Sequence, residues 1–178
     1  MKKMLIPAAT LLLVAACATV RPAPISATAR LEAKSGSNVS GTVRFEDVMA
    51  EGVPAVRVTL DARGVPPGLH GFHVHEKGDC SAPDATSAGG HFNPGGAPHG
   101  GPGASTHHAG DFGNVEASAD GRARVTYVMP GVTLGTGSSS ITGKAIILHS
   151  DPDDLVTQPT GNAGGRIACG VIALDEGL

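Results

Sequence analysis

The sequence predicts an all-β fold: a Greek-key antiparallel β-sandwich or flattened barrel with two long irregular loops. Short segments of alternating or continuous apolar character recur along the chain. The 178 residues include 26 glycines and 13 prolines, which favour turns over long helices. No amphipathic helical pattern and no internal repeat is found. Seven or eight short strands at this spacing are typical of a β-sandwich or barrel.

The expected strands are separated by turn signals rich in glycine, proline and serine. They fall near residues 28–34, 38–45, 55–61, 70–75, in a hairpin within 114–128, and at 144–150 and 168–174. Asp120-Gly121 is placed at the turn of the hairpin. Val56, Val58 and Leu60 alternate with polar residues, which predicts one buried face and one wet face.

Two long stretches, residues 77–111 and 150–167, lack this periodicity. The first is rich in glycine and proline, and a loop of this length inside a compact domain needs an organising element other than strand pairing. Metal ligands and a disulfide can provide one. The chain has no Trp, one Tyr and four Phe, so its core is expected to consist mainly of Val, Ile, Leu and Ala.

The beginning of the chain is predicted to be a lipoprotein signal. Two lysines precede a mostly apolar run, residues 4–16, which is shorter than the ~20 residues that span a bilayer. The run ends in VAAC, which resembles a bacterial lipobox and makes Cys17 the lipidated residue after cleavage. An ordinary secretory signal is the alternative. The predicted organisation is a signal peptide (1–16), a lipidated N-terminus with tether (17–29) and one domain (30–178).

Charge and cysteine content restrict the partners and the compartment. The formal charge is −3 with no basic block, so nucleic acid is not an expected partner. Removal of residues 1–16 takes away two lysines and no acid, which leaves a mature charge of −5. Lipidation of Cys17 leaves Cys80 and Cys169, and export to an oxidising compartment favours a disulfide between them. Two buried free thiols are the alternative.

Seven of the eight histidines lie between positions 70 and 108. His73 and His75 end a predicted strand, and residues two apart share one face of a sheet, so both imidazoles could chelate one metal. Two half-exposed strand histidines are the plainer interpretation of this pair alone. The glycine-rich loop adds three imidazoles and a carboxylate, a set suited to tetrahedral Zn²⁺: His91, His99, His108 and Asp111. His149 adds an imidazole from a later strand.

Six motifs, in this order, make the chain similar to copper/zinc superoxide dismutases. They are LHGFHVHEKGD, SAGGHFNP, HGGP, HHAGDFGNV, ILH and GNAGGRIACGVI. The resemblance covers roughly residues 30–174. It implies an enzyme that disproportionates superoxide to dioxygen and hydrogen peroxide, with one copper and one zinc ion in each subunit.

Carried over residue by residue, the resemblance implies two ligand sets. The copper set is His73, His75, His91 and His149, and the zinc set is His91, His99, His108 and Asp111. Four imidazoles suit Cu(II). His91 would bridge the two metals and act catalytically by taking up and returning a proton. His108 is preferred over its neighbour His107 because the zinc histidine of the family lies three residues before the zinc aspartate, here Asp111.

The resemblance also assigns residues around the metals. Arg166 would dock the anionic substrate beside copper. Asp153, four residues after the last copper ligand, would bridge ligands of the two sites, with Asp151 and Asp154 as rivals. His70 matches a family position that binds no metal, and it is expected to be a packed, hydrogen-bonded histidine.

Two features resemble the bacterial periplasmic branch of the family. The segment after Asp154, LVTQPT, is short and contains no Lys or Glu, and a long run separates Cys80 from His91. With the signal, they imply a periplasmic enzyme that is anchored by lipid to an envelope membrane and protects the envelope from superoxide. Monomer and homodimer both stay open.

Three other functions compete with this interpretation: a copper buffer or delivery protein, a structural domain that keeps only zinc, and a metal-free adhesion-type sandwich. The first would lack a copper ligand or the substrate arginine, and the second would lose His73, His75 or His149 first. All of these residues are present, which favours the enzyme.

Overall fold

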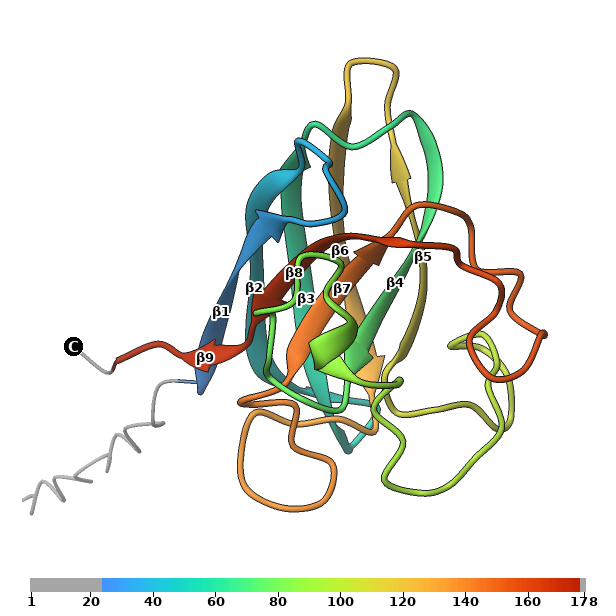
Figure 1. Ribbon diagram of the computed structural model, residues 1–178. Helices are drawn as coiled ribbons and strands as arrows, with labels where there is room; N and C mark the ends of the chain where they lie inside the picture. Colours follow the sequence, from blue (N-terminus) through green and yellow to red (C-terminus); the bar gives the residue numbers. More distant parts are fainter. Residues whose placement is uncertain (1–23, 177–178) are drawn as a thin grey trace, which may run out of the picture.

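The computed structural model describes residues 24–176 as a closed antiparallel β-barrel (Figure 1). Its strands are β1 (Ser26–Ala33), β2 (Ser40–Ala50), β3 (Val53–Arg63), β4 (Gly68–His75), β5 (Asp111–Ala117), β6 (Arg122–Pro130), β7 (Ala145–His149), β8 (Arg166–Val171) and β9 (Ala173–Leu174). Within this part of the chain the one helical element is a 3₁₀ turn, η1 (Thr86–Ala88), and no helix is long and apolar enough to cross a membrane. The predicted fold class is confirmed.

The strand order is β2-β3-β6-β5-β4-β7-β8-β1, and β1 pairs again with β2 to close the barrel. Closure removes the exposed strand edges that an open sheet would present. One half of the wall consists of β1, β2, β3 and β6, and the other of β5, β4, β7 and β8. Between β2 and β3 the chain reverses at Glu51 and Gly52, which both have positive φ (50° and 84°), a conformation that glycine adopts without strain.

The main core fills the inside of the barrel. Val56, Val58 and Leu60 are at most 1% exposed, and the polar residues between them face outward, as the alternation predicts. Phe45 and Phe72 are fully buried in the same core. Each side chain of this kind stabilises the fold by about 1.5–3 kcal/mol when it is fully buried.

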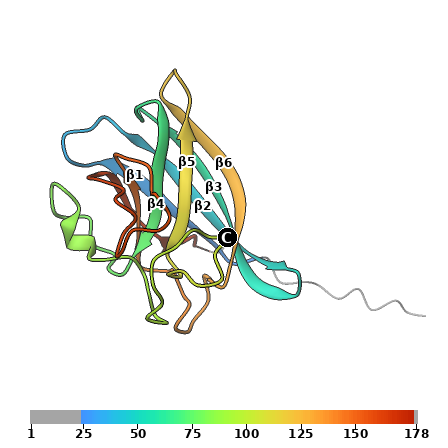
Figure 2. The same ribbon diagram turned by 90° about the vertical axis from the view of Figure 1, so that its right-hand side faces the viewer.

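The two irregular stretches pack mainly against the outside of the wall, although Phe92 of the first stretch belongs to the main core. In Figure 2 the loop that carries η1 lies on the opposite side of the barrel from β6. The predicted strand at 168–174 appears as β8 and β9, and between them the backbone of Ile172 bonds Gly143 and Lys144, just before β7. The predicted signal peptide and the lipidation site Cys17 lie outside the described residues.

Candidate metal centre

Strand β4 sends alternate side chains to the two sides of the barrel wall. Phe72 and Val74 point into the main core, so His73 and His75 project from the outer surface. Both histidines are nevertheless 0% exposed, because the long loops cover them. The register of β4 against β5 shifts between Gly71 and His73, a type of irregularity that commonly re-aims side chains next to functional sites.

The structure brings together all seven residues that were predicted to bind metal. Their ligand atoms form two groups, each within 4.8 Å: His73, His75, His91 and His149, and His91, His99, His108 and Asp111. All seven are buried. His91 belongs to both groups and its ring centroid lies 4.1 Å from that of His73. Ligand side chains as far apart in sequence as His73 and His149, 76 positions, thus meet on the outer surface of β4.

Several ring nitrogens in this cluster are buried without a hydrogen-bond partner in the described part of the chain. They are Nδ1 of His73, Nε2 of His91 and Nδ1 of His99, the last of which lies 3.1 Å from Oδ2 of Asp111 but not in hydrogen-bonding geometry. A buried polar atom left unpaired costs about 1–3 kcal/mol, so a bound cation would stabilise these ring nitrogens. Nε2 of His75 and Nε2 of His149 also lie only 3.3 Å apart. Two neutral rings tolerate such a short separation when the lone pairs of both nitrogens point at one metal ion. The donor set therefore fits copper and zinc.

The opposite ring nitrogens are held in place by acceptors. Nδ1 of His75 lies 3.0 Å from the carbonyl oxygen of Gly89, and Nδ1 of His149 lies 3.4 Å from that of Gly164. An acceptor at one nitrogen fixes the tautomer and leaves the lone pair of the other for the metal. Burial lowers the pKa of His75 well below its usual value and that of His149 to about 3, so both rings stay neutral at physiological pH.

Asp111 supplies the negative charge of the second group. Its Oδ1 lies 2.8 Å from Nδ1 of His91 and 3.2 Å from Nδ1 of His108. Its Oδ2 accepts hydrogen bonds from the backbone N–H groups of Gly100 and His108. Burial alone would raise the pKa of this carboxyl, but the hydrogen bonds outweigh burial and lower the pKa, so the side chain is a carboxylate.

The neighbouring histidines at 107 and 108 differ in position. His108 is buried among the second group of ligand atoms. His107 is partly exposed and its Nδ1 lies 2.7 Å from the carbonyl oxygen of His108, outside the group. The geometry agrees with the choice of His108. His70 is buried, and its two nitrogens face the carbonyl oxygens of His149 and Pro66, as expected for a packed histidine that binds no metal.

Asp153 links the two groups. Its Oδ2 lies 2.8 Å from Nε2 of His73 and its Oδ1 lies 3.0 Å from Nε2 of His99. Of the three rival aspartates it alone is buried, at 3% exposed, whereas Asp154 accepts hydrogen bonds from its own loop. A Cβ atom at Gly161 would overlap Oδ1 of Asp153, and its φ of 66° is a second reason for glycine there.

Two residues that the sequence interpretation missed hold the loops around these groups. The side-chain amide of Asn114 donates to the carbonyl oxygen of Asp153 and accepts from its N–H, both at 2.8 Å. Gln158 makes the same kind of paired contact with the backbone of His99, at 2.7 and 2.8 Å. Asn114 stands within the motif HHAGDFGNV, which was its only sequence signal.

Replacement of Asp153 by Asn tests this link. The amide NH₂ must face one of two imidazole N–H groups, so one donor loses its acceptor and a ligand ring is freed to rotate. Loss of such a partner usually weakens metal affinity about 10–100-fold, and we expect that range for both metals. Chelator competition on purified protein measures it. Asp151→Asn is the matched control and should stay near wild type; equal losses in both variants would contradict the link.

Arg166 begins β8 and lies beside the first group. Its guanidinium donates to the carbonyl oxygens of Ala85 and Gly89, both at 2.7 Å. The carbonyl of Gly89 also faces His75, so one backbone group positions both the arginine and a ligand ring. Partial burial lowers the pKa of Arg166 from its ordinary value, which is so high that the side chain stays charged at any working pH.

A disulfide joins Cys80 to Cys169, as predicted. Cys169 is fully buried in a small apolar cluster outside the barrel wall, together with Ala85, Ala88 and Ile147. The cluster fastens the loop that bears η1 to β7 and β8. The carbonyl groups that hold Arg166 belong to this same loop.

We expect Cys80→Ser to lower thermal stability and to loosen Arg166. The bond closes a loop of 89 residues, for which chain entropy gives a stabilisation of about 4–5 kcal/mol. Calorimetry of metal-loaded protein should therefore show a melting temperature lower by about 8–20 °C, at ~2–4 °C per kcal/mol for a domain of this size. Ser81→Ala, an exposed neighbour, serves as the control. Free thiols at both positions in native protein would contradict the bond itself.

A closed barrel with two buried ligand groups that share one imidazole defines a metalloprotein with a histidine-bridged two-metal site. A family model described as copper/zinc superoxide dismutase matches residues 39–172, and the chain belongs to this family. The chain is therefore a superoxide dismutase that uses copper and zinc. Among solved structures it is similar to the clock protein EA4, with 38% identity and a TM-score of 0.76 over 88% of this chain and 98% of the other.

Proposed function

We propose that the protein is a lipid-anchored member of the bacterial periplasmic branch, which removes superoxide at the cell envelope. The enzymatic part of the proposal rests on seven buried ligand residues that form two groups, with His91 common to both. The motif VAAC after a short apolar run supports the anchor at Cys17. The short segment LVTQPT and the long run from Cys80 to His91 support the branch.

The proposed ligands are those implied by the resemblance. Copper would be held by His73, His75, His91 and His149, and zinc by His91, His99, His108 and Asp111. Copper supplies one-electron redox chemistry when bound, and zinc supplies a fixed positive charge. His91 belongs to both ligand groups, which supports it as the bridging residue.

Other residues would transfer the proton, bind the anion and orient the ligand rings. Nε2 of His91, which is buried and has no hydrogen-bond partner in the described residues, is the proposed atom that takes up and delivers a proton. The guanidinium of Arg166 binds the oxygen of the incoming anion. Asp153 keeps His73 and His99 in fixed orientations, and Asp111 supplies a buried negative charge to the zinc side.

Metal content and a superoxide assay on the same purified sample test the enzymatic proposal. The expected result is one copper and one zinc per chain with rapid disproportionation of superoxide. A protein with both metals and no activity would instead be a copper buffer or delivery module. Zinc without a copper site would indicate a structural domain.

The anchor has its own test. Mass spectrometry of the mature protein from the native host should find an N-terminal Cys17 that carries acyl chains. We expect Cys17→Ser to move the protein from the membrane fraction to the soluble fraction while its dismutase activity stays unchanged. A soluble wild-type product that begins at another residue would contradict the lipidation.

A further inference from the structure

Six of the seven arginines in residues 24–176 lie on one outer surface of the barrel, over β1, β2, β3 and β6. They are Arg30, Arg44, Arg57, Arg63, Arg122 and Arg124, and all are exposed. Each alternates with side chains that point into the core. No two are adjacent in sequence, so the chain shows no basic block although the folded barrel carries one. We call this surface the arginine face.

Strand register concentrates the charge further. Arg63 on β3 stands directly opposite Arg122 on β6, and Arg124 stands opposite Asp61. Like charges directly opposite each other destabilise a pair of strands. Arg63 and Arg122 therefore make a pairing that is unfavourable for the sheet by itself. Asp120, 3.8 Å from Arg122, offsets this repulsion in part, and an anion at Arg63 would relieve the rest.

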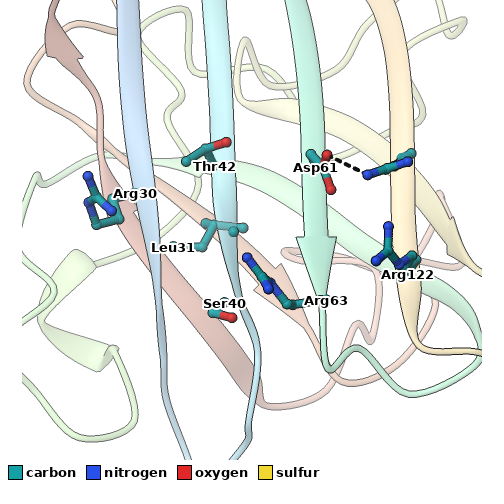
Figure 3. A pocket seen from close by; sticks show the side chains of 9 residues that line it. Arg30, Leu31, Ser40, Thr42, Asp61, Arg63 and Arg122 are labelled. Carbon is teal, nitrogen blue, oxygen red and sulfur yellow. Dashed lines mark ion pairs between the residues drawn. The ribbon is translucent and has the colours of Figure 1, made fainter.

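Part of this charge has no partner within the chain. Arg57 pairs with Glu46 and Arg124 pairs with Asp61, both at 3.0 Å, and Arg122 pairs more loosely with Asp120, at 3.8 Å. No carboxylate in the described residues comes within ion-pair distance of Arg30, Arg44 or Arg63. A shallow depression of about 400 Å³ lies between the strands, and Figure 3 shows Arg30, Arg63 and Arg122 around it.

The arginine face contrasts with the rest of the protein. Its six arginines are accompanied on the same strand surfaces by three carboxylates, Glu32, Glu46 and Asp61, which gives a net charge of +3. The remaining described residues hold four basic and thirteen acidic side chains, a net charge of −9. The metal ligands come from β4, β7, the start of β5 and the loop that precedes it, on the other half of the barrel wall.

We propose that the arginine face docks on an anionic phospholipid surface and binds its phosphate groups. Guanidinium groups match phosphate oxygens in pairs, and a broad cationic face complements a flat anionic surface better than it does a small ligand. Strand β1 is part of the arginine face and begins at Ser26, and eight residues separate Ser26 from Cys17. Under the proposed lipidation they reach at most about 30 Å, which keeps the face near the membrane.

Docking would complete the anchor and orient the enzyme. A lipid and a polybasic surface hold a protein on a membrane more firmly than either alone. With the arginine face on the membrane, the metal centre on the other half of the wall faces the aqueous space from which superoxide arrives.

Vesicle co-sedimentation tests the docking without the lipid. The protein is the copper- and zinc-loaded chain from residue 17 with Cys17→Ser, which keeps all nine strands. It should bind phosphatidylcholine vesicles that contain phosphatidylglycerol, should not bind phosphatidylcholine alone, and should be released by high salt. Arg30→Gln with Arg63→Gln removes two unpaired charges and should weaken binding about 25-fold, at about fivefold per arginine.

Two further double variants separate specific docking from net charge. Lys77→Gln with Lys144→Gln causes the same change in net charge beside β4 and β7, and should leave vesicle binding within about twofold of wild type. Arg30→Lys with Arg63→Lys should retain most of the binding. Equal losses in the two glutamine variants, equal binding to both vesicle types, or binding of soluble polyaspartate without vesicle binding would each overturn the proposal. None of these outcomes affects the acylation or the dismutase assay, which test the proposed function separately.

Discussion

His75→Ala should reduce superoxide disproportionation to the level of metal-free protein while zinc remains bound. His75 belongs to the first group of ligand atoms only, so its loss opens the predicted copper site and leaves the zinc set complete. The side chain is fully buried and its Nδ1 faces the carbonyl of Gly89, so the ring is held with Nε2 toward the other copper ligands. Metal analysis should find zinc at about one per chain and little copper.

The reciprocal change locates the second metal. Asp111→Ala removes a carboxylate that belongs to the second group only, so we expect zinc binding to weaken first. His108→Ala should do the same, with the partly exposed His107→Ala as the matched control on the adjacent residue. Zinc loss in the His107 variant and not in the His108 variant would reverse the choice between these neighbours.

Arg166→Glu should lower the rate at least tenfold at low salt, with both metals still bound. The mature protein is expected to carry a charge of −5, so bulk charge repels superoxide and the attraction must be local. Arg166 is partly exposed beside the first ligand group, where two backbone carbonyls hold its guanidinium. Focused local charge of this kind raises association rates by about 10–1000-fold. Steady-state rates from pulse radiolysis measure the effect.

Arg166→Lys separates charge from geometry. Lysine keeps the charge and loses the planar fork, so the variant should retain part of the activity. The wild-type rate should fall as salt rises, because screening shortens the range of the field to about 8–10 Å near physiological ionic strength. An Arg166→Glu enzyme that matches wild type at low salt would show that another group docks the anion.

Local patterns in the sequence were sufficient for the fold class and for the ligand types. Val56, Val58 and Leu60 alternate because a strand places successive side chains on opposite faces, and all three are buried in the core. The pair His73 and His75 follows the same rule, so its shared face could be read directly. The disulfide was also accessible, since only two cysteines remain once Cys17 is assigned to the lipid.

The resemblance implied Asp153 but left two neighbouring aspartates as rivals. Only the tertiary structure separates the three, because burial and contact with His73 and His99 depend on how the two loops fold over β4. The same holds for the amides of Asn114 and Gln158, whose partners lie 39 and 59 residues away. The order of residues along the chain does not show which distant residues come into contact.

The sequence by itself determined an all-β chain with the ligands of a copper and zinc site, because strand periodicity and ligand type are local properties. The tertiary structure decided where charge gathers. Arg63 and Arg122 are far apart along the chain and become direct neighbours through the β3–β6 register. Hydrogen bonding between strands fixes that register over the whole barrel, so the arginine face exists only after the barrel has closed.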